Sequence, residues 1–210
     1  MREGLNRIGS IPERKMKPKS PQAPPILHCA QQADWFAWLE EHHATSPGVW
    51  LKLAKKGSDA RSLTYDEAIE AALCFGWIDG QKQAQDAQFW RQKFTRRTNK
   101  SIWSKINKAK ALALVEAGRM KPAGLSEMAR AKHDGRWDAA YDSAGTATVP
   151  ADFQSALDRR PRALAFFQTL DARNRYALLF RIQTAKKAET RAARIAKFVH
   201  MLEQHEKLHP

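Results

Sequence analysis

The chain has 210 residues, 43% of them hydrophobic and 28% charged, and its 36 Lys and Arg against 22 Asp and Glu give a formal net charge of +14. This composition is typical of a globular protein, and no apolar run approaches the roughly 18 residues that a transmembrane helix needs. It disfavours a membrane protein and favours an anionic partner: nucleic acid, an anionic lipid surface or an acidic protein.

Residues 1–28 predict a disordered, basic tail. Five of the ten prolines of the chain fall in this segment, which has too few apolar residues to offset the entropy of ordering. No apolar stretch follows Arg2 and Arg7, which disfavours a secretory signal and predicts a cytoplasmic protein. Met16 is a second candidate start, and the sequence leaves open which of Met1 and Met16 begins translation.

Residues 29–141 predict an α+β domain with a small antiparallel sheet packed with helices. Trp35 to His42 has the apolar spacing of a helix, and Val49 to Ala54 alternates as a strand does. Thr64 to Glu67 forms a capping box, which predicts a helix that runs to about Phe75 and ends at Gly76. Cys74 lies in this apolar helix, where we expect a buried, reduced thiol.

The second half of this domain predicts a pair of strands and then two helices. Extended segments at Trp77–Gly80 and Phe89–Thr95 are expected to pair as antiparallel neighbours. Ser101 is the predicted N-cap of a helix that ends at Gly118, and Pro122 begins another helix.

The remainder of the chain predicts a linker and a helical region. Residues 142–149 are rich in Ser, Gly and Thr, and Pro150 begins a helical group that fills 150–210. In the last helix Ile195, Phe198, Val199 and Leu202 share one face. The fold class is therefore α+β, followed by an all-helical C-terminal region.

Several motifs resemble the YdeI/OmpD-associated (bacteriocin-protection) family. They are Lys55-Lys56-Gly57, Thr64-Tyr65-Asp66-Glu67-Ala68, Ala72 to Gly80, Lys93 to Ser104, Gly118 to Gly124 and Ala185 to Arg191, and together they span about residues 35–202. Two prolines of the family pattern are replaced by Arg96 and Asn99, so the loop should be less rigid than usual. The resemblance implies an OmdA-like C-terminal region and a role in bacteriocin or antimicrobial-peptide resistance, envelope stress and porin association. It implies no reaction, catalytic residue or cofactor.

The strongest candidate site is the basic segment 91–110, which holds eight Lys and Arg and no acid. Guanidinium groups before a helix N-terminus suit phosphate, and neighbouring aromatic rings suit stacking on bases. The predicted ligand-binding residues are Trp77, Asp79, Arg96, Arg97, Lys100, Ser101, Trp103 and Lys105. The alternative is a solvated basic face over aromatic core residues.

Asp79 has three alternative interpretations. It is a candidate general acid or base with Tyr65 or Ser101, which would make the chain a small enzyme with a pocket around Asp79 and Trp77. It could instead accept backbone amides in a tight turn with Gly80 at positive φ, or pair with Arg97 across the hairpin. The spacing shows no nucleophile–base pair, and it predicts neither a metal site nor a cofactor. We therefore expect a non-enzymatic accessory protein.

Overall fold

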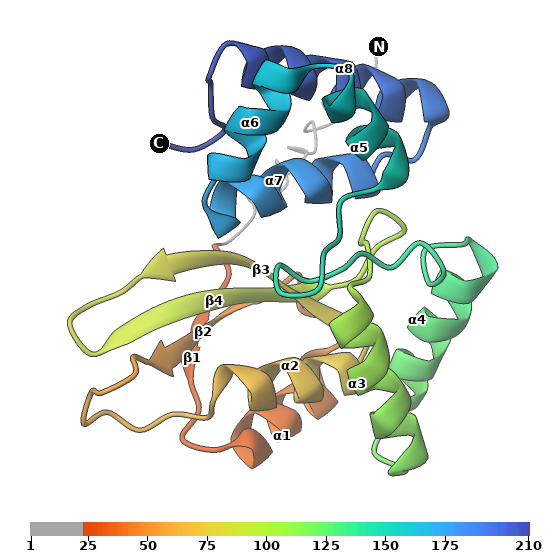
Figure 1. Ribbon diagram of the computed structural model, residues 1–210. Helices are drawn as coiled ribbons and strands as arrows, with labels where there is room; N and C mark the ends of the chain where they lie inside the picture. The colour runs from red at the N-terminus through yellow and green to blue at the C-terminus, as the bar shows by residue number, and fades with distance from the viewer. Residues whose placement is uncertain (1–22) are drawn as a thin grey trace, which may run out of the picture.

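The computed structural model describes residues 23–210 (Figure 1). Most of the predicted tail, with Met16, lies outside the described residues. The elements of the first part are β1 (Ile26–His28), α1 (Gln32–His42), β2 (Val49–Ala54), α2 (Tyr65–Cys74), β3 (Trp77–Ala84), β4 (Phe89–Arg96), α3 (Lys105–Glu116) and α4 (Pro122–His133). Those of the second part are α5 (Ala151–Asp158), α6 (Pro161–Thr169), α7 (Ala172–Gln183) and α8 (Ala188–Glu203).

The four strands form one sheet in the order β1-β2-β4-β3. β4 pairs antiparallel with both β2 and β3, as predicted, whereas β1 pairs parallel with β2, so the sheet is mixed rather than purely antiparallel. The prediction that disorder extends to residue 28 is wrong at Ile26–His28, because this short strand bonds to β2 and Trp50 donates its amide to the Pro25 carbonyl.

Local signals in the sequence explain most helix boundaries. The Thr64 hydroxyl accepts the Glu67 amide while the Glu67 carboxylate accepts the Thr64 amide, which confirms the capping box at the start of α2. Gly76 has φ +70, a conformation that allows the chain to leave α2 and enter β3 within two residues. Pro122 is the first residue of α4, where its missing amide costs nothing.

The predicted N-cap of α3 was wrong by three residues. Ser104 caps the helix, because its hydroxyl accepts the Asn107 amide at 3.1 Å. The Ser101 hydroxyl instead accepts the Thr98 amide at 2.9 Å and closes a turn. Ser104 also forms an isolated bridge with Tyr141, which keeps the chain extended until the helix begins.

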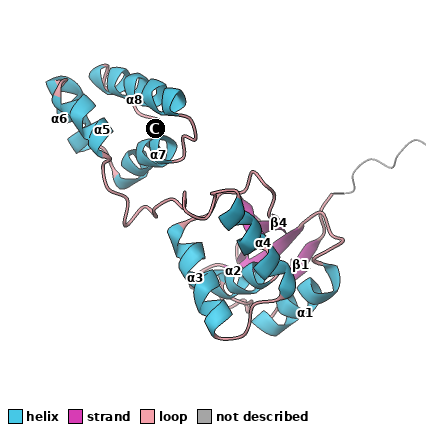
Figure 2. Ribbon diagram, turned by 90° about the vertical axis from the view of Figure 1, so that its right-hand side faces the viewer, coloured by secondary structure: helices cyan, strands magenta, loops and turns pink. Residues whose placement is uncertain are grey.

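One hydrophobic core lies between the sheet and helices α1 to α4, which Figure 2 shows together in one part of the molecule. Its largest fully buried side chains are Trp35, Trp77, Trp103 and Phe94. The indole of Trp35 donates to the Ala68 carbonyl at 3.1 Å and that of Trp77 to the His43 carbonyl at 3.2 Å. Both rings therefore bury large apolar area without leaving their N–H groups unpaired.

A second core is built by α5 to α8 alone, and it includes Ile195, Phe198, Val199 and Leu202 of the last helix as predicted. The two cores share no residue. Figures 1 and 2 show the helical bundle set apart from the sheet and joined to it by the segment after α4. Among residues 23–210, no helix has both the length and the apolar character that crossing a bilayer requires.

Asp142 ties the two parts together. Its carboxylate accepts Lys105 Nζ of α3 at 2.6 Å and Gln183 Nε2 of α7 at 2.6 Å, and its carbonyl accepts the Tyr176 hydroxyl at 2.9 Å. These bonds lower the pKa of Asp142, with the Lys105 contact as the main cause. The start of the linker is thus held against both α3 and α7.

Candidate functional site: the basic segment and the Asp79 pocket

The eight basic residues of segment 91–110 do not form one continuous patch. Three of them, all in α3, pair with carboxylates: Lys105 with Asp142 at 2.6 Å, Lys108 with Asp138 at 3.9 Å and Lys110 with Asp66 at 3.2 Å. Arg91 and Lys93 belong to the sheet, where β4 places them on the face opposite α1 and α2. The positive charge that the sequence concentrates is therefore divided among three places.

Arg97, predicted to bind a ligand, lies inside the protein and is 4% exposed. Its guanidinium carbon lies 3.7 Å from the centroid of the Trp103 ring, and Nη1 donates to the Ile102 carbonyl at 3.1 Å. Burial lowers the pKa of Arg97 to about 10, and the nearby Glu127 and Asp79 oppose that change. Arg97 and Trp103 (1% exposed) are placed as structural partners rather than as ligand contacts.

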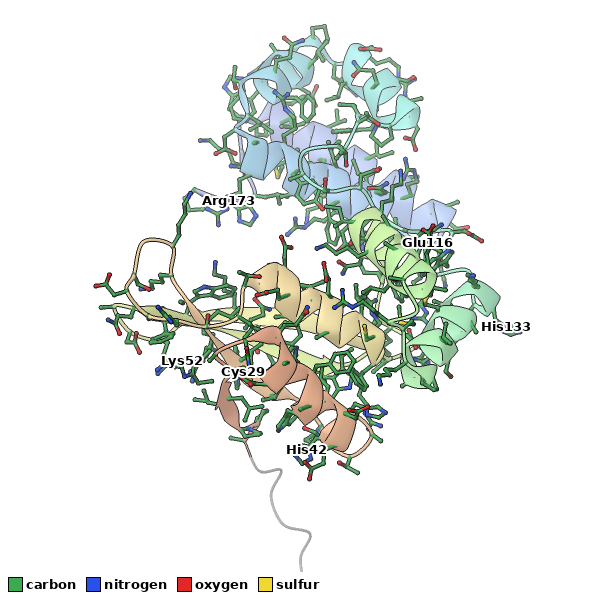
Figure 3. All side chains as sticks on the ribbon, turned by 90° about the horizontal axis from the view of Figure 1, so that it is seen from below. Cys29, His42, Lys52, Glu116, His133 and Arg173 are labelled. Carbon is green, nitrogen blue, oxygen red and sulfur yellow. The ribbon has the colours of Figure 1, made fainter. Side chains whose placement is uncertain are left out.

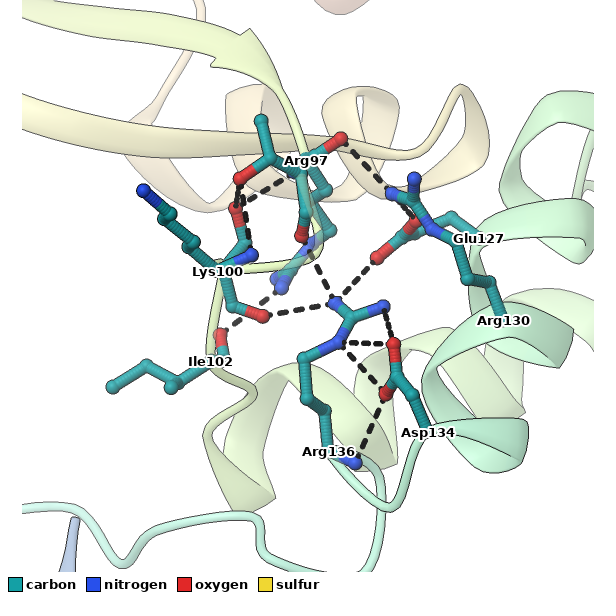
Figure 4. A network of polar contacts seen from close by, with 9 residues as sticks. Arg97, Lys100, Ile102, Glu127, Arg130, Asp134 and Arg136 are labelled. Carbon is teal, nitrogen blue, oxygen red and sulfur yellow. Dashed lines mark hydrogen bonds and ion pairs between the residues drawn. The ribbon is translucent and has the colours of Figure 1, made fainter. Parts of the chain in front are cut away.

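A buried ion network surrounds Arg97 (Figure 4). The Glu127 carboxylate, 6% exposed, accepts Arg136 Nη1 at 2.9 Å and also pairs with Arg130. Arg136 in turn binds Asp134 at 2.8 Å and donates to the carbonyls of Thr98 and Ser101. The loop after β4 is thus held in place by α4 and the segment that follows it.

The remaining predicted ligand contacts differ in their exposure. Arg96 and Lys100 are exposed, and Arg96 Nη1 donates to the Ala44 carbonyl at 3.0 Å. Ser101 is half-buried and occupied by its turn. Trp77 is fully buried in the first core, so it cannot stack on a ligand without unfolding the site.

Asp79 and Tyr65 meet in a pocket of about 330 Å³. The Tyr65 hydroxyl donates to Asp79 Oδ2 at 2.8 Å. The pocket is lined by Tyr65, Asp66, Ile69, Asp79, Ser104, Ile106, Asn107, Tyr141, Ser143, Ala144 and Tyr176. Asp79 is therefore neither a cap of backbone amides in a tight turn nor an ion-pair partner of Arg97. It lies in β3, beside a bulge, and Gly80 does not have positive φ.

Tyr65 is held as a hydrogen-bond donor to Asp79. Burial raises the pKa of Tyr65, and the hydrogen bond to Asp79 raises it further, so the phenol stays protonated at neutral pH. Burial also raises the pKa of Tyr141, with Asp79 adding to the effect. A tyrosine used as a base or nucleophile needs the opposite shift. Ser101, the third catalytic candidate, does not line the pocket.

The sequence analysis missed Tyr141, Tyr176 and Ser104, which complete this pocket, and Glu127 and Arg136, which anchor the basic loop. Tyr141 lies between α4 and the linker, and Tyr176 lies in α7, so no local pattern connects them with Asp79. Glu127 could have been noticed as an acid on the apolar side of a predicted helix. Within residues 23–210, no three His, Cys, Asp or Glu side chains gather as a metal site would need.

Two family profiles match parts of the chain. Residues 27–127 match a domain of unknown function, DUF8412, and residues 146–205 match the family described as bacteriocin-protection, YdeI or OmpD-associated. No curated protein and no solved structure matches the chain significantly. Of the motifs behind the predicted resemblance, only Ala185 to Arg191 lies in the second match, and the others lie in the first. The C-terminal helical region, residues 146–205, is thus similar to the bacteriocin-protection, YdeI or OmpD-associated family, which agrees with the resemblance that the sequence predicted.

Proposed function

We propose that this chain is a non-enzymatic accessory protein that binds the phosphate backbone of a nucleic acid through the outer face of its sheet. We define the outer sheet face as the side chains of β1, β2 and β4 that point away from α1 and α2. They are Ile26, His28, Trp50, Lys52, Ala54, Phe89, Arg91, Lys93 and Thr95.

One observation carries the proposal. Lys52 and Arg91 are direct partners in the register of β2 and β4, and Lys93 lies two residues farther along β4 opposite Trp50. Like charges directly opposite on a sheet repel each other, and no outer-face residue is a carboxylate. The nearest acid, Asp86 in the β3–β4 hairpin, reaches Lys52 at 3.8 Å. A row of phosphates would relieve this repulsion.

The aromatic residues of the outer sheet face hold the cations in place. Lys52 Nζ lies 4.0 Å from the centroid of the Phe89 ring, and the guanidinium carbon of Arg91 lies 5.0 Å from that of Trp50. Both rings are 9% exposed, so they support the cations rather than stack on bases. The outer sheet face would therefore bind phosphate groups through their charge and would not recognise the base sequence. Arg96, the last residue of β4, alternates to the other side of the strand and donates to the Ala44 carbonyl, so it is not part of the outer sheet face.

On this proposal the protein acts in the cytoplasm, and any part in bacteriocin or antimicrobial-peptide resistance, envelope stress or porin association is indirect. A chain with net charge +14 repels cationic peptides at long range, so binding them on its surface is unfavourable. Acting through a nucleic acid avoids this repulsion.

Titration with fluorescent single-stranded DNA at several salt concentrations tests the proposal. The triple variant Lys52→Gln, Arg91→Gln, Lys93→Gln should lower the slope of log affinity against log salt by about 2, since each lost phosphate contact removes about 0.7. The matched control Arg162→Gln, Arg173→Gln, Lys197→Gln removes three exposed charges from the helical bundle (Arg173 is labelled in Figure 3). If both variants lost the same amount of salt slope, the binding would be general electrostatic attraction. If the protein bound anionic vesicles but not DNA, its anionic partner would be a lipid surface.

A further inference from the structure

The Asp79 pocket has the opposite electrostatic character to the rest of the protein. Its lining includes two carboxylates, Asp66 and Asp79, and three tyrosines, but no Lys, Arg or His. In a chain with 36 Lys and Arg, a cavity of about 330 Å³ without one basic residue is a distinct environment. It lies where α2, β3 and α3 meet the linker and α7.

The two carboxylates are not equivalent. Asp66 is paired with Lys110 of α3 at 3.2 Å. Among residues 23–210, the Asp79 carboxylate has no ion pair within 4.0 Å, and its one hydrogen bond is the one that Oδ2 accepts from the Tyr65 hydroxyl. Arg97 lies close enough to Asp79 to interact by charge, yet its guanidinium is directed to Trp103 and Ile102. Oδ1 of Asp79 is therefore available to a ligand.

Neighbouring rings fix the tyrosines of the pocket. Tyr141 packs edge-on against Phe180 of α7 with ring centroids 4.9 Å apart, and the Tyr176 hydroxyl is bonded to the Asp142 carbonyl. Tyr65 packs against Trp90 of β4 at 5.9 Å. Rigid aromatic walls around a carboxylate favour a positively charged group, because ring faces and carboxylate attract the same charge.

We propose that this cavity binds a small organic cation, an ammonium or guanidinium group on a short chain, with Asp79 as its counter-charge and Tyr65, Tyr141 and Tyr176 as its walls. The cavity volume is at the lower end of the range for small-molecule sites, which fits one such group and a few methylenes. The group can come from a free amine or from the end of a Lys or Arg side chain of a basic peptide. This site is separate from the outer sheet face and does not depend on it.

The test is a calorimetric titration with agmatine, n-butylammonium, the neutral match n-butanol and a short Lys-containing peptide. We expect both free cations to bind and butanol not to. Asp79→Asn should weaken cation binding about tenfold, the effect of losing one charge-assisted hydrogen bond, because Asn still accepts from Tyr65 and keeps the shape. Asp138→Asn, a carboxylate outside the pocket, is the matched control and should leave binding unchanged. If the peptide bound and the free amines did not, the ligand of this site would be a Lys or Arg side chain of a basic peptide.

A second measurement needs no variant. Aromatic proton–carbon NMR spectra of the wild-type protein should show shifts of the Tyr65, Tyr141 and Tyr176 rings on addition of agmatine, and single-stranded DNA should neither cause nor reverse them. Equal binding of butanol and butylammonium would overturn the proposal. So would an unchanged affinity in Asp79→Asn, or shifts confined to other aromatic residues.

Discussion

Replacing Glu127 with Gln is expected to lower the free energy of unfolding by about 3 to 5 kcal/mol, the cost of removing one partner from a buried ion pair. The side chains of Glu127 and Arg136 are 6% and 4% exposed, and they form an ion pair at 2.9 Å. Without the carboxylate, Arg136 and Arg97 would be two like charges buried near each other. Asp134 alone would remain to balance Arg136.

Urea denaturation followed by Trp fluorescence measures this loss. Glu116→Gln is the matched control, because Glu116 is exposed on α3 (Figure 3), and it should change stability by less than about 0.5 kcal/mol. If Glu127→Gln were as stable as this control, Glu127 would not be the residue that balances the buried arginines.

Replacing Gly124 with Ala is expected to cost about 3 kcal/mol, at the upper end for overpacking. Gly124 lies in the first turn of α4, which crosses the end of α2. An added Cβ would lie 2.8 Å from the Leu73 carbonyl oxygen and closer still to that of Cys74 and to the Met120 sulfur. The sulfur can move, but the two carbonyls belong to the last turn of a buried helix, so α4 would have to shift outward.

Such a shift would also move Glu127, which lies one turn farther along α4, so we expect Gly124→Ala to expose Arg97. Thermal unfolding by circular dichroism gives the stability change. Gly145→Ala serves as the control, because an added Cβ there meets nothing within 4 Å. Comparable melting temperatures for the two variants would contradict the close packing of α4 on α2.

The sequence predicted elements well where the signal was local. The strand Val49–Ala54, the capping box at Thr64 and the helix begun by Pro122 were each confirmed at their boundaries, because alternation, side-chain caps and proline act on neighbouring residues. β1 was missed because three residues beside two prolines carry no strand pattern, and only pairing with β2 makes them a strand.

The candidate site was harder to predict because its character depends on long-range packing. The charges of 91–110 form one basic segment in the sequence. In the fold, the alternation of β4 places some of them on the outer sheet face, Arg97 is buried in the core, and those of α3 pair with carboxylates. Arg97 is the clearest case: its neighbours are exposed, yet it is buried by Trp103 and balanced by Glu127, thirty residues away in sequence. Asp79 and Tyr65 were correctly considered together, but Tyr141 and Tyr176 reach them only through the tertiary fold.

The most direct test of the central claim, that the outer sheet face binds a polyanion, is lysine footprinting of the wild-type protein. The protein is acetylated briefly with and without single-stranded DNA, and modification at each lysine is measured by mass spectrometry. We predict that DNA protects Lys52 and Lys93 and leaves Lys197 of α8 unchanged. If DNA left the acetylation of all three lysines unchanged, or protected Lys197 alone, the proposal would be contradicted and the binding site would lie away from the sheet.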